Sequence, residues 1–228
     1  MKNKEQEIID MILEMKKLGY PDEKIVEDFE TKLLKLHNLK LSQFFPVNIK
    51  GADVKAHGQV IIDSEDLEEN YEFATHVKGA DVKAHGMVIA NSGNLLYNYK
   101  FARDAKGADT WAHEQVILDS KNLEYNYIFA RDVKKANVRA HGKVIIDSGD
   151  LEYNYKFASD VKGADVRAHG KVIINGGSIE YNEKFKLIEG SDIDAHVTAI
   201  NNTKIQKCKE SLNECLDSMI KEKVKVKK

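Results

Sequence analysis

The chain has 228 residues, of which 42% are hydrophobic and 32% are charged, a composition typical of a folded protein and too hydrophobic for a disordered one. The formal net charge of −2 excludes a molecule that attracts nucleic acid through its overall charge. No stretch approaches the roughly 18 consecutive apolar residues that a membrane span needs, and the charged first segment lacks the apolar core of a secretory signal. We therefore expect a cytoplasmic protein.

Residues 1–49 are predicted to form an N-terminal helical cap. Apolar residues at helical spacing predict an amphipathic helix from Lys4 to Leu18, which Gly19 ends. Pro21 begins a second helix, which runs to about His37. This pair of helices would shield the open face of the segment that follows.

Residues 50–189 repeat one sequence five times with a period of 28 residues. The five repeats begin at Lys50, Lys78, Lys106, Lys134 and Lys162. A fixed period of this length is the signature of a solenoid, in which each repeat packs mainly on its neighbours. The repeats contain no proline, which favours helices because a helix interior excludes proline.

The first half of each repeat is predicted to be a helix of about ten residues. In the first repeat, Val54, His57 and Ile61 follow helical spacing, and Asp53 is a good N-cap. Ser64 is expected to end this helix and to act as the N-cap of the next one, as are its equivalents Ser92, Ser120 and Ser148.

The second half of each repeat is predicted to be another helix. Leu67, Asn70 and Ala74 again follow helical spacing. Gly79 is placed to act as a left-handed C-cap, and Lys135 replaces this glycine in one repeat.

A β-solenoid with 28-residue coils is the alternative fold. The segment GQVIID is rich in β-branched residues, and Tyr97, Tyr99 and Phe101 alternate with other residues. The same aromatic slots also satisfy the i, i+4 pairing of a helix. Glu114 replaces a glycine of the first helix, which suits an exposed helical position. We therefore favour helices.

The pattern decays after the fifth repeat. Glu183 takes a tyrosine position and Lys186 an alanine position. Residues 190–228 are predicted to hold a degenerate sixth repeat, a capping helix from about Thr203 to Lys221 and a basic tail. The expected fold is all-α: an α/α solenoid of five 28-residue helical-hairpin repeats plus a degenerate sixth, with N- and C-terminal capping helices.

Two cysteines, Cys208 and Cys215, fall in the predicted C-terminal helix. Their Cα atoms should lie about 10 Å apart, beyond the reach of a disulfide. We interpret them as reduced, half-buried residues of a cytosolic protein. No family motif surrounds Cys208 and His196 that would support a thiol nucleophile.

Six histidines recur in one slot of the repeat: His57, His85, His113, His141, His169 and His196. An array of metal ions is one interpretation. Equivalent residues on stacked helices lie about 8–10 Å apart, whereas two ligands of one zinc ion approach within about 4 Å. We expect a structural ladder of inter-helix hydrogen bonds or packing, with no metal, cofactor or catalytic residue.

A second ladder consists of asparagines: Asn70, Asn98, Asn126, Asn154 and Asn182. These amides share a helix face with Leu and Tyr, so they should be buried and hydrogen-bonded. We expect bonds between repeats, to a neighbouring turn or to the next amide.

The slots that vary between repeats are the candidates for binding a partner. On the first helix they hold Lys83 and Met87, Trp111 and Gln115, Arg139 and Lys143, and Arg167 and Lys171. On the second helix they hold Lys100, Arg103, Ile128 and Arg131. An exposed Trp111 flanked by Met87, Arg139 and Lys143 resembles an interface hot spot. The alternative is a Trp111 ring that lies flat on its own helix.

The repeat contains the pattern N-Y-x-F-A-x-D-V-K-G-A-D, formed in one copy by Asn154, Tyr155, Phe157, Ala158, Asp160, Val161, Lys162, Gly163, Ala164 and Asp165. This pattern resembles a repeat of uncharacterised bacterial and phage-type proteins, and more broadly the two-helix HEAT and TPR repeats, which are longer. The resemblance covers Lys50 to about Glu189. It implies an α-solenoid and no catalytic residue.

We therefore expect a non-enzymatic module that binds another protein, as an adaptor or as an inhibitor that occludes its partner. The alternative is a helical-repeat protein that binds nucleic acid along the stripe of lysines and arginines. The near-neutral charge weighs against that alternative, as do the acidic ladder residues Asp104, Asp132 and Asp160. A metal-dependent enzyme is a third hypothesis.

Overall fold

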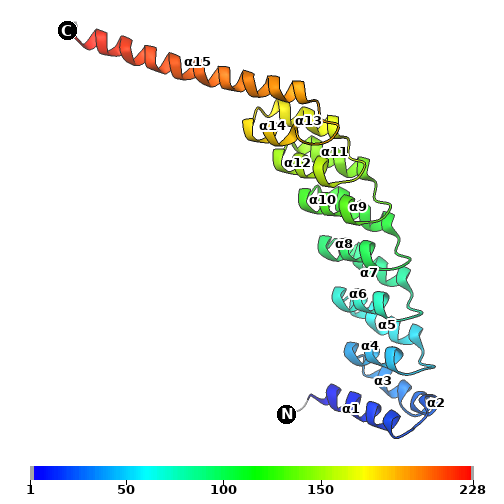
Figure 1. Cartoon of the computed structure of the whole chain (residues 1–228). Helices are drawn as coiled ribbons and strands as arrows, with labels where there is room; N and C mark the ends of the chain where they lie inside the picture. The colour runs from blue at the N-terminus through cyan, green and yellow to red at the C-terminus, as the bar shows by residue number, and fades with distance from the viewer. Residues whose placement is uncertain (1–2, 227–228) are drawn as a thin grey trace. The chain divides into compact units, whose positions relative to one another are not determined.

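The computed structural model describes the backbone of residues 3–226 and the side chains of residues 3–218. The secondary structure of these residues is helical, without strands (Figure 1). The fold is an α-solenoid of helical-hairpin repeats, as predicted, and the β-solenoid is excluded.

Each repeat contributes two helices. The first helices are α5 (Val54–Ser64), α7 (Val82–Asn91), α9 (Thr110–Ser120), α11 (Val138–Ser148) and α13 (Val166–Asn175). The second helices are α6 (Leu67–His76), α8 (Leu95–Asp104), α10 (Leu123–Asp132), α12 (Leu151–Asp160) and α14 (Ile179–Phe185). The N-cap prediction is confirmed for Asp53, whose side chain accepts a hydrogen bond from the Ala56 amide at 2.9 Å.

The helices form two compact units. Unit 1 contains the described residues up to Ser120 together with Val133–Lys135, and unit 2 contains Lys121–Asp132 and the described residues from Ala136 onward. In both units the second helix of a repeat packs most extensively on the first helix of the following repeat, as α6 does on α7 and α12 on α13.

Phenylalanine and isoleucine form the spine of each unit. In unit 1, Phe73 packs with Ile61, and Phe101 packs with Ile89. All four side chains are fully buried. Burying a side chain of this size stabilises the fold by about 1.5–3 kcal/mol, so the repeated pair accounts for much of the stability of each hairpin.

The prediction for Ser64 is wrong. The Ser64 hydroxyl donates to the carbonyl oxygen of Ile61 at 2.7 Å, so the serine belongs to the last turn of α5. Asp66 is the N-cap of α6, because its side chain accepts from the Glu69 amide at 3.0 Å. A hydroxyl that bonds back into its own helix does not cap the next one. The same backward bond is made by Ser92, Ser120 and Ser148.

Gly79 has a positive φ of 90° but is not a helix C-cap. The C-cap of α6 is Val77 in extended conformation, and the Ala80 amide donates to the Val77 carbonyl at 3.1 Å. Gly79 is therefore the third residue of a tight turn, a position that favours glycine. Lys135 has a positive φ of 68° in the equivalent position.

The N-terminal segment contains one helix that was not predicted. α1 (Lys4–Lys17) matches the prediction, and the second predicted helix consists of α2 (Asp22–Ile25), the π-helix η1 (Val26–Glu30) and α3 (Thr31–Lys35). The unpredicted helix is α4 (Leu39–Asn48), which packs on α5 as α6 packs on α7. Phe45 and Ile49 are buried, and they precede the equivalent Phe73 and Val77 by one 28-residue period.

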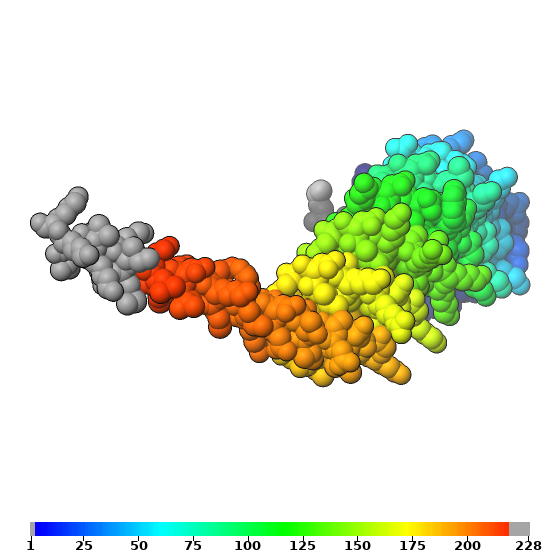
Figure 2. Space-filling model, turned by 90° about the horizontal axis from the view of Figure 1, so that it is seen from above, coloured from blue at the N-terminus to red at the C-terminus, as the bar shows by residue number. Residues whose placement is uncertain are grey.

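The degenerate sixth repeat and the predicted C-terminal helix form one helix, α15 (Ile193–Val226). His196 and Ile200 are buried in the part of α15 that packs on α13 and α14. Residues 204–218 are exposed, and in Figure 2 this part of α15, coloured orange to red, extends away from the yellow helices of unit 2. Cys208 and Cys215 are therefore exposed rather than half-buried.

The predicted basic tail lies outside the residues whose side chains are described. Among the described residues, none of the helices combines the length and hydrophobicity that crossing a bilayer requires.

Candidate interaction surfaces

The predicted histidine ladder and the predicted asparagine ladder are joined by one hydrogen bond that recurs from repeat to repeat. The Nδ1 atom of each histidine after His57 lies close to the Oδ1 atom of the asparagine in the preceding repeat. The distances are 2.8 Å for His85–Asn70, 2.7 Å for His113–Asn98, 2.8 Å for His141–Asn126, 2.7 Å for His169–Asn154 and 2.6 Å for His196–Asn182.

The asparagine fixes which histidine nitrogen carries the hydrogen. The Nδ2 group of Asn154 donates to the carbonyl oxygens of Ile145 at 2.9 Å and Asp150 at 2.7 Å. Its Oδ1 atom is then the acceptor, so Nδ1 of His169 is the donor and Nε2 holds the lone pair. Asn154 thus bonds to its own repeat through Nδ2 and to the next repeat through Oδ1. The partner in the next repeat is a histidine, not the next asparagine amide.

Burial keeps the histidines neutral near pH 7. Desolvation lowers the pKa of His85, His113, His141 and His169 to about 4. The Nε2 atoms of His85, His169 and His196 are buried and have no hydrogen-bond partner among the described residues. In the same part of the chain, no three His, Cys, Asp or Glu side chains lie close enough to hold a metal ion together.

A glycine of the preceding first helix lies against this Nε2 atom. A Cβ atom on Gly142 would lie 3.2 Å from Cε1 of Phe157 and 3.4 Å from Nε2 of His169. The glycine therefore allows the two first helices to approach closely. The prediction that Glu114 occupies an exposed position is wrong, because this slot faces the interior and Glu114 is only 6% exposed.

Two arginines predicted to bind a partner are engaged within the chain. Arg103 donates to both carboxylate oxygens of Asp104 at 2.7 Å and to the Tyr99 hydroxyl at 3.0 Å. Arg131 contacts Asp132 and Tyr127 in the same way. Both guanidinium groups are therefore held by their own helix, which makes them weak candidates for an interface.

Lys100 and Ile128, the other two residues of the second helices that were predicted to bind a partner, also make contacts within the chain. Nζ of Lys100 lies between two tyrosine rings, 5.7 Å from the centre of Tyr71 and 5.5 Å from that of Tyr97. Ile128 is half-buried against the cluster that contains Tyr127. Lys100 therefore contacts the preceding repeat through Tyr71, and Ile128 packs against a buried cluster.

Tyrosine and aspartate continue those contacts within each unit. The Tyr71 hydroxyl donates to Asp104 at 2.8 Å, and the Tyr127 hydroxyl donates to Asp160 at 2.5 Å. Burial, followed by the hydrogen bond to Asp104, raises the pKa of Tyr71 to about 12. These two members of the acidic ladder therefore join consecutive repeats.

The first helices of unit 1 carry an exposed apolar surface. Trp111 is 68% exposed on α9, and Met87 is 56% exposed on the neighbouring helix α7. Lys83 is exposed and Gln115 is half-buried. An exposure of 68% leaves most of the indole open, which speaks against a ring lying flat on its helix. We call Lys83, Met87, Trp111 and Gln115 the Trp surface.

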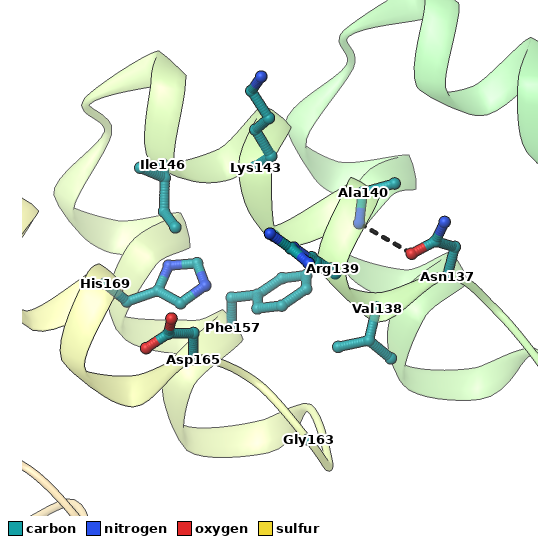
Figure 3. A pocket seen from close by; sticks show the side chains of 11 residues that line it. Asn137, Val138, Arg139, Ala140, Lys143, Ile146, Phe157, Gly163, Asp165 and His169 are labelled. Carbon is teal, nitrogen blue, oxygen red and sulfur yellow. Dashed lines mark hydrogen bonds between the residues drawn. The ribbon is translucent and has the colours of Figure 1, made fainter.

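The first helices of unit 2 carry a basic surface. It consists of the exposed side chains Arg139 and Lys143 on α11 and Arg167 and Lys171 on α13. Within the described part of the chain, no hydrogen bond or ion pair engages these four cations. Arg139 and Lys143 line a groove of about 590 Å3 between α11 and α13, together with His169 and Phe157 (Figure 3).

Asp165 also lines this groove and was not predicted as a site residue. A signal was present in the sequence, because the slot that holds Asp165 also holds Asp53 and Asp81, each of which caps a first helix. The N-cap position of a first helix is therefore the sequence feature by which Asp165 could have been found.

Comparisons of the chain with known protein families, curated proteins and solved structures find no match. The resemblance to HEAT and TPR repeats and to bacterial and phage-type repeats therefore stays a prediction.

Proposed function

We propose that this protein is a non-enzymatic, cytoplasmic interaction module that binds another protein through the first-helix face of its repeats. The observation that carries the proposal is the Trp surface. Trp111 and Met87 are both more than half exposed on adjacent helices of unit 1. Removing apolar surface of this kind from water is the main driving force of protein association.

The variable slots of the first and second helices differ in whether their cations are paired within the chain, and this difference supports the same proposal. Arg103 and Arg131 are paired with neighbouring aspartates. The four cations of the basic surface have no such partner among the described residues. Tryptophan and arginine are enriched where a few contacts dominate binding. The module would act as an adaptor, or as an inhibitor that occludes its partner.

The test begins with identification of the partner. A photo-crosslinking amino acid in place of Gln115 in the full chain would trap proteins bound at the Trp surface in cells. The trapped protein is purified, and its affinity for the original chain is measured by isothermal titration calorimetry. Trp111→Ala should then weaken binding by about 2 kcal/mol or more.

The matched control is Lys55→Ala, since Lys55 occupies the same slot in the first repeat and is exposed. This variant should leave the affinity unchanged. Equal affinities of the Trp111→Ala variant and the original chain would remove the Trp surface from the interface.

Nucleic-acid binding is the second candidate function, and the basic surface favours it. Its four cations lie on two packed first helices of unit 2. Binding to phosphates would release counterions, so the affinity for a single-stranded RNA should fall steeply between about 50 and 200 mM salt, by roughly tenfold or more. A mobility-shift assay at these two concentrations separates this function from protein binding at the Trp surface.

A further inference from the structure

The groove between α11 and α13 has two walls of opposite character. The α11 wall carries Arg139 and Lys143, and the α13 wall carries Asp165 and His169 (Figure 3). Asp165 caps α13 by accepting from the Ala168 amide at 3.0 Å through one carboxylate oxygen. One wall thus offers cations and the other offers hydrogen-bond acceptors.

The next groove repeats this arrangement. Between α13 and α15, Arg167 and Lys171 line one side of a groove of about 440 Å3, and Asp192 and His196 line the other. Asp192 accepts from the Ala195 amide at 3.1 Å, as Asp165 does from Ala168. Unit 2 therefore presents two successive grooves with the same chemistry.

The histidine in each groove leaves one buried acceptor unused. Nδ1 of His169 and of His196 is used by the asparagine ladder, and the Nε2 atom of each has no partner among the described residues. Both side chains are fully buried. Each Nε2 atom lies beneath the groove against Gly142 or Gly170 of the preceding first helix, so the acceptors open to a ligand are the exposed carboxylates of Asp165 and Asp192.

We propose that these two grooves bind an extended acidic peptide segment of the partner protein. Its carboxylates lie against Arg139 and Lys143 in one groove and against Arg167 and Lys171 in the next, and its N–H groups face the acceptors of the opposite walls. The proposal rests on the proposed function, because it names the kind of partner that the module recognises.

The repeat spacing sets the spacing of the acidic residues. Packed helices lie about 8–10 Å apart, and a peptide in the extended polyproline II conformation advances about 3.1 Å per residue and repeats its side-chain direction every three residues. One carboxylate in each of two successive grooves therefore requires acidic residues about three positions apart.

The acceptor walls favour a peptide over a nucleic acid. Asp165 and Asp192 would repel a continuous chain of phosphates, whereas they can accept hydrogen bonds from the amides of a peptide. A peptide supplies both donors and carboxylates at fixed intervals, and a phosphate backbone supplies acceptors alone.

The test uses the full chain and fluorescein-labelled peptides in an anisotropy titration. The first peptide is GSEGSEGSEGS, in which glutamates stand three positions apart. One control peptide has glutamine at each glutamate position, and another, GSGGSEEESGS, has three adjacent glutamates. We expect the spaced peptide to bind about tenfold more tightly than either control. A labelled oligothymidine of similar length should bind more weakly than the spaced peptide.

Variants then locate the site. Arg139→Gln together with Lys143→Gln should weaken binding of the spaced peptide by about tenfold, as should Arg167→Gln together with Lys171→Gln. Lys55→Gln is the matched control, because it removes an exposed cation from the same slot of the first repeat, outside both grooves and the Trp surface, and it should have no effect. Thermal melting of each variant checks that it is folded.

Three results would overturn the proposal: no saturable binding of the spaced peptide, equal binding of the spaced and clustered peptides, or equal or tighter binding of the oligothymidine. The proposed function is judged separately. Loss of partner binding in the Trp111→Ala variant would still support a protein-binding module even if the acidic peptide failed to bind.

Discussion

Nδ1 of His169 donates to Oδ1 of Asn154 at 2.7 Å, from the first helix of one repeat to the second helix of the repeat before it. Neither side chain is accessible to solvent. The bond therefore forms where water cannot replace it, and the same geometry recurs along both units.

Asn154→Leu tests how much this ladder contributes to stability. The substitution leaves Nδ1 of His169 without its acceptor. It also removes one of two donors from the carbonyls of Ile145 and Asp150, which keep the Ser148 hydroxyl and the backbone amide of residue 154. We expect the free energy of unfolding to fall by about 3 kcal/mol, measured by urea denaturation. The control is Glu152→Ala on the exposed side of the same helix, which should cost less than about 0.5 kcal/mol. A loss below about 1 kcal/mol for Asn154→Leu would contradict this account.

Ser42→Asn tests whether the ladder can be extended into the N-terminal segment. Ser42 occupies the asparagine slot of α4, and its hydroxyl and Nδ1 of His57 are both buried without a hydrogen-bond partner among the described residues. The amide should reach Nδ1 of His57 and raise the free energy of unfolding by about 1 kcal/mol. Ser42→Ala serves as the comparison, because it removes the hydroxyl without adding the acceptor. A Ser42→Asn variant no more stable than Ser42→Ala would show that the amide does not reach His57.

Gly86→Ala tests the close approach of the first helices. A Cβ atom here would lie 2.9 Å from Cε1 of Phe101 and 3.3 Å from Nε2 of His113, both in side chains that are almost completely buried. Alanine favours helix by about 1 kcal/mol, and overpacking costs about 1–3 kcal/mol. We expect a net loss of stability. Gly58→Ala should cost less, because its nearest contact would be 3.2 Å, to Cε1 of Phe73. A gain in thermal stability for Gly86→Ala would contradict the steric account.

Acidification should weaken the fold. The pKa of His85, His113, His141 and His169 is lowered to about 4 in the folded chain, against about 6.5 in an unfolded chain. The unfolded state therefore binds more protons between these values. The stability is fully present above pH 6.5 and falls as the pH drops towards 4, by about 1.4 kcal/mol per pH unit for each histidine.

Urea denaturation at pH 7.0, 6.0 and 5.0 measures this dependence. A His169→Gln variant has one titrating site fewer, so its unfolding free energy should depend less steeply on pH than that of the original chain. Parallel pH profiles of the two proteins would show that His169 is not a source of the acid sensitivity.

The repeat and its helical periodicity made the fold predictable, because each helix buries residues at i, i+3 and i+4. The exposure of Trp111 followed from a slot that holds Lys or Arg in other repeats. The details that failed depend on side-chain geometry. Nothing in the spacing around Ser64 distinguishes a hydroxyl that bonds back to Ile61 from one that caps the next helix. Glu114 is charged and yet only 6% exposed, so the charge of a side chain does not by itself indicate exposure in this slot.

The unpredicted helix α4 had a signal in the sequence. Phe45 and the run from Ile49 to Asp53 match Phe73 and the run from Val77 to Asp81, one period later. Pro46 obscured this match, because proline is disfavoured inside helices. The pairing of Arg103 with Asp104 was also readable as adjacent opposite charges, but its geometry required the structure.

The orientation of the ladder makes the two ends of a unit chemically unequal. Each asparagine is oriented by carbonyls of its own repeat, so removal of the following repeat exposes only an acceptor that water can satisfy. Removal of the preceding repeat instead exposes the Nδ1–H donor of an imidazole. One end of a stack of repeats therefore presents an amide acceptor and the other end an imidazole donor, as Asn154 and His169 do where they meet.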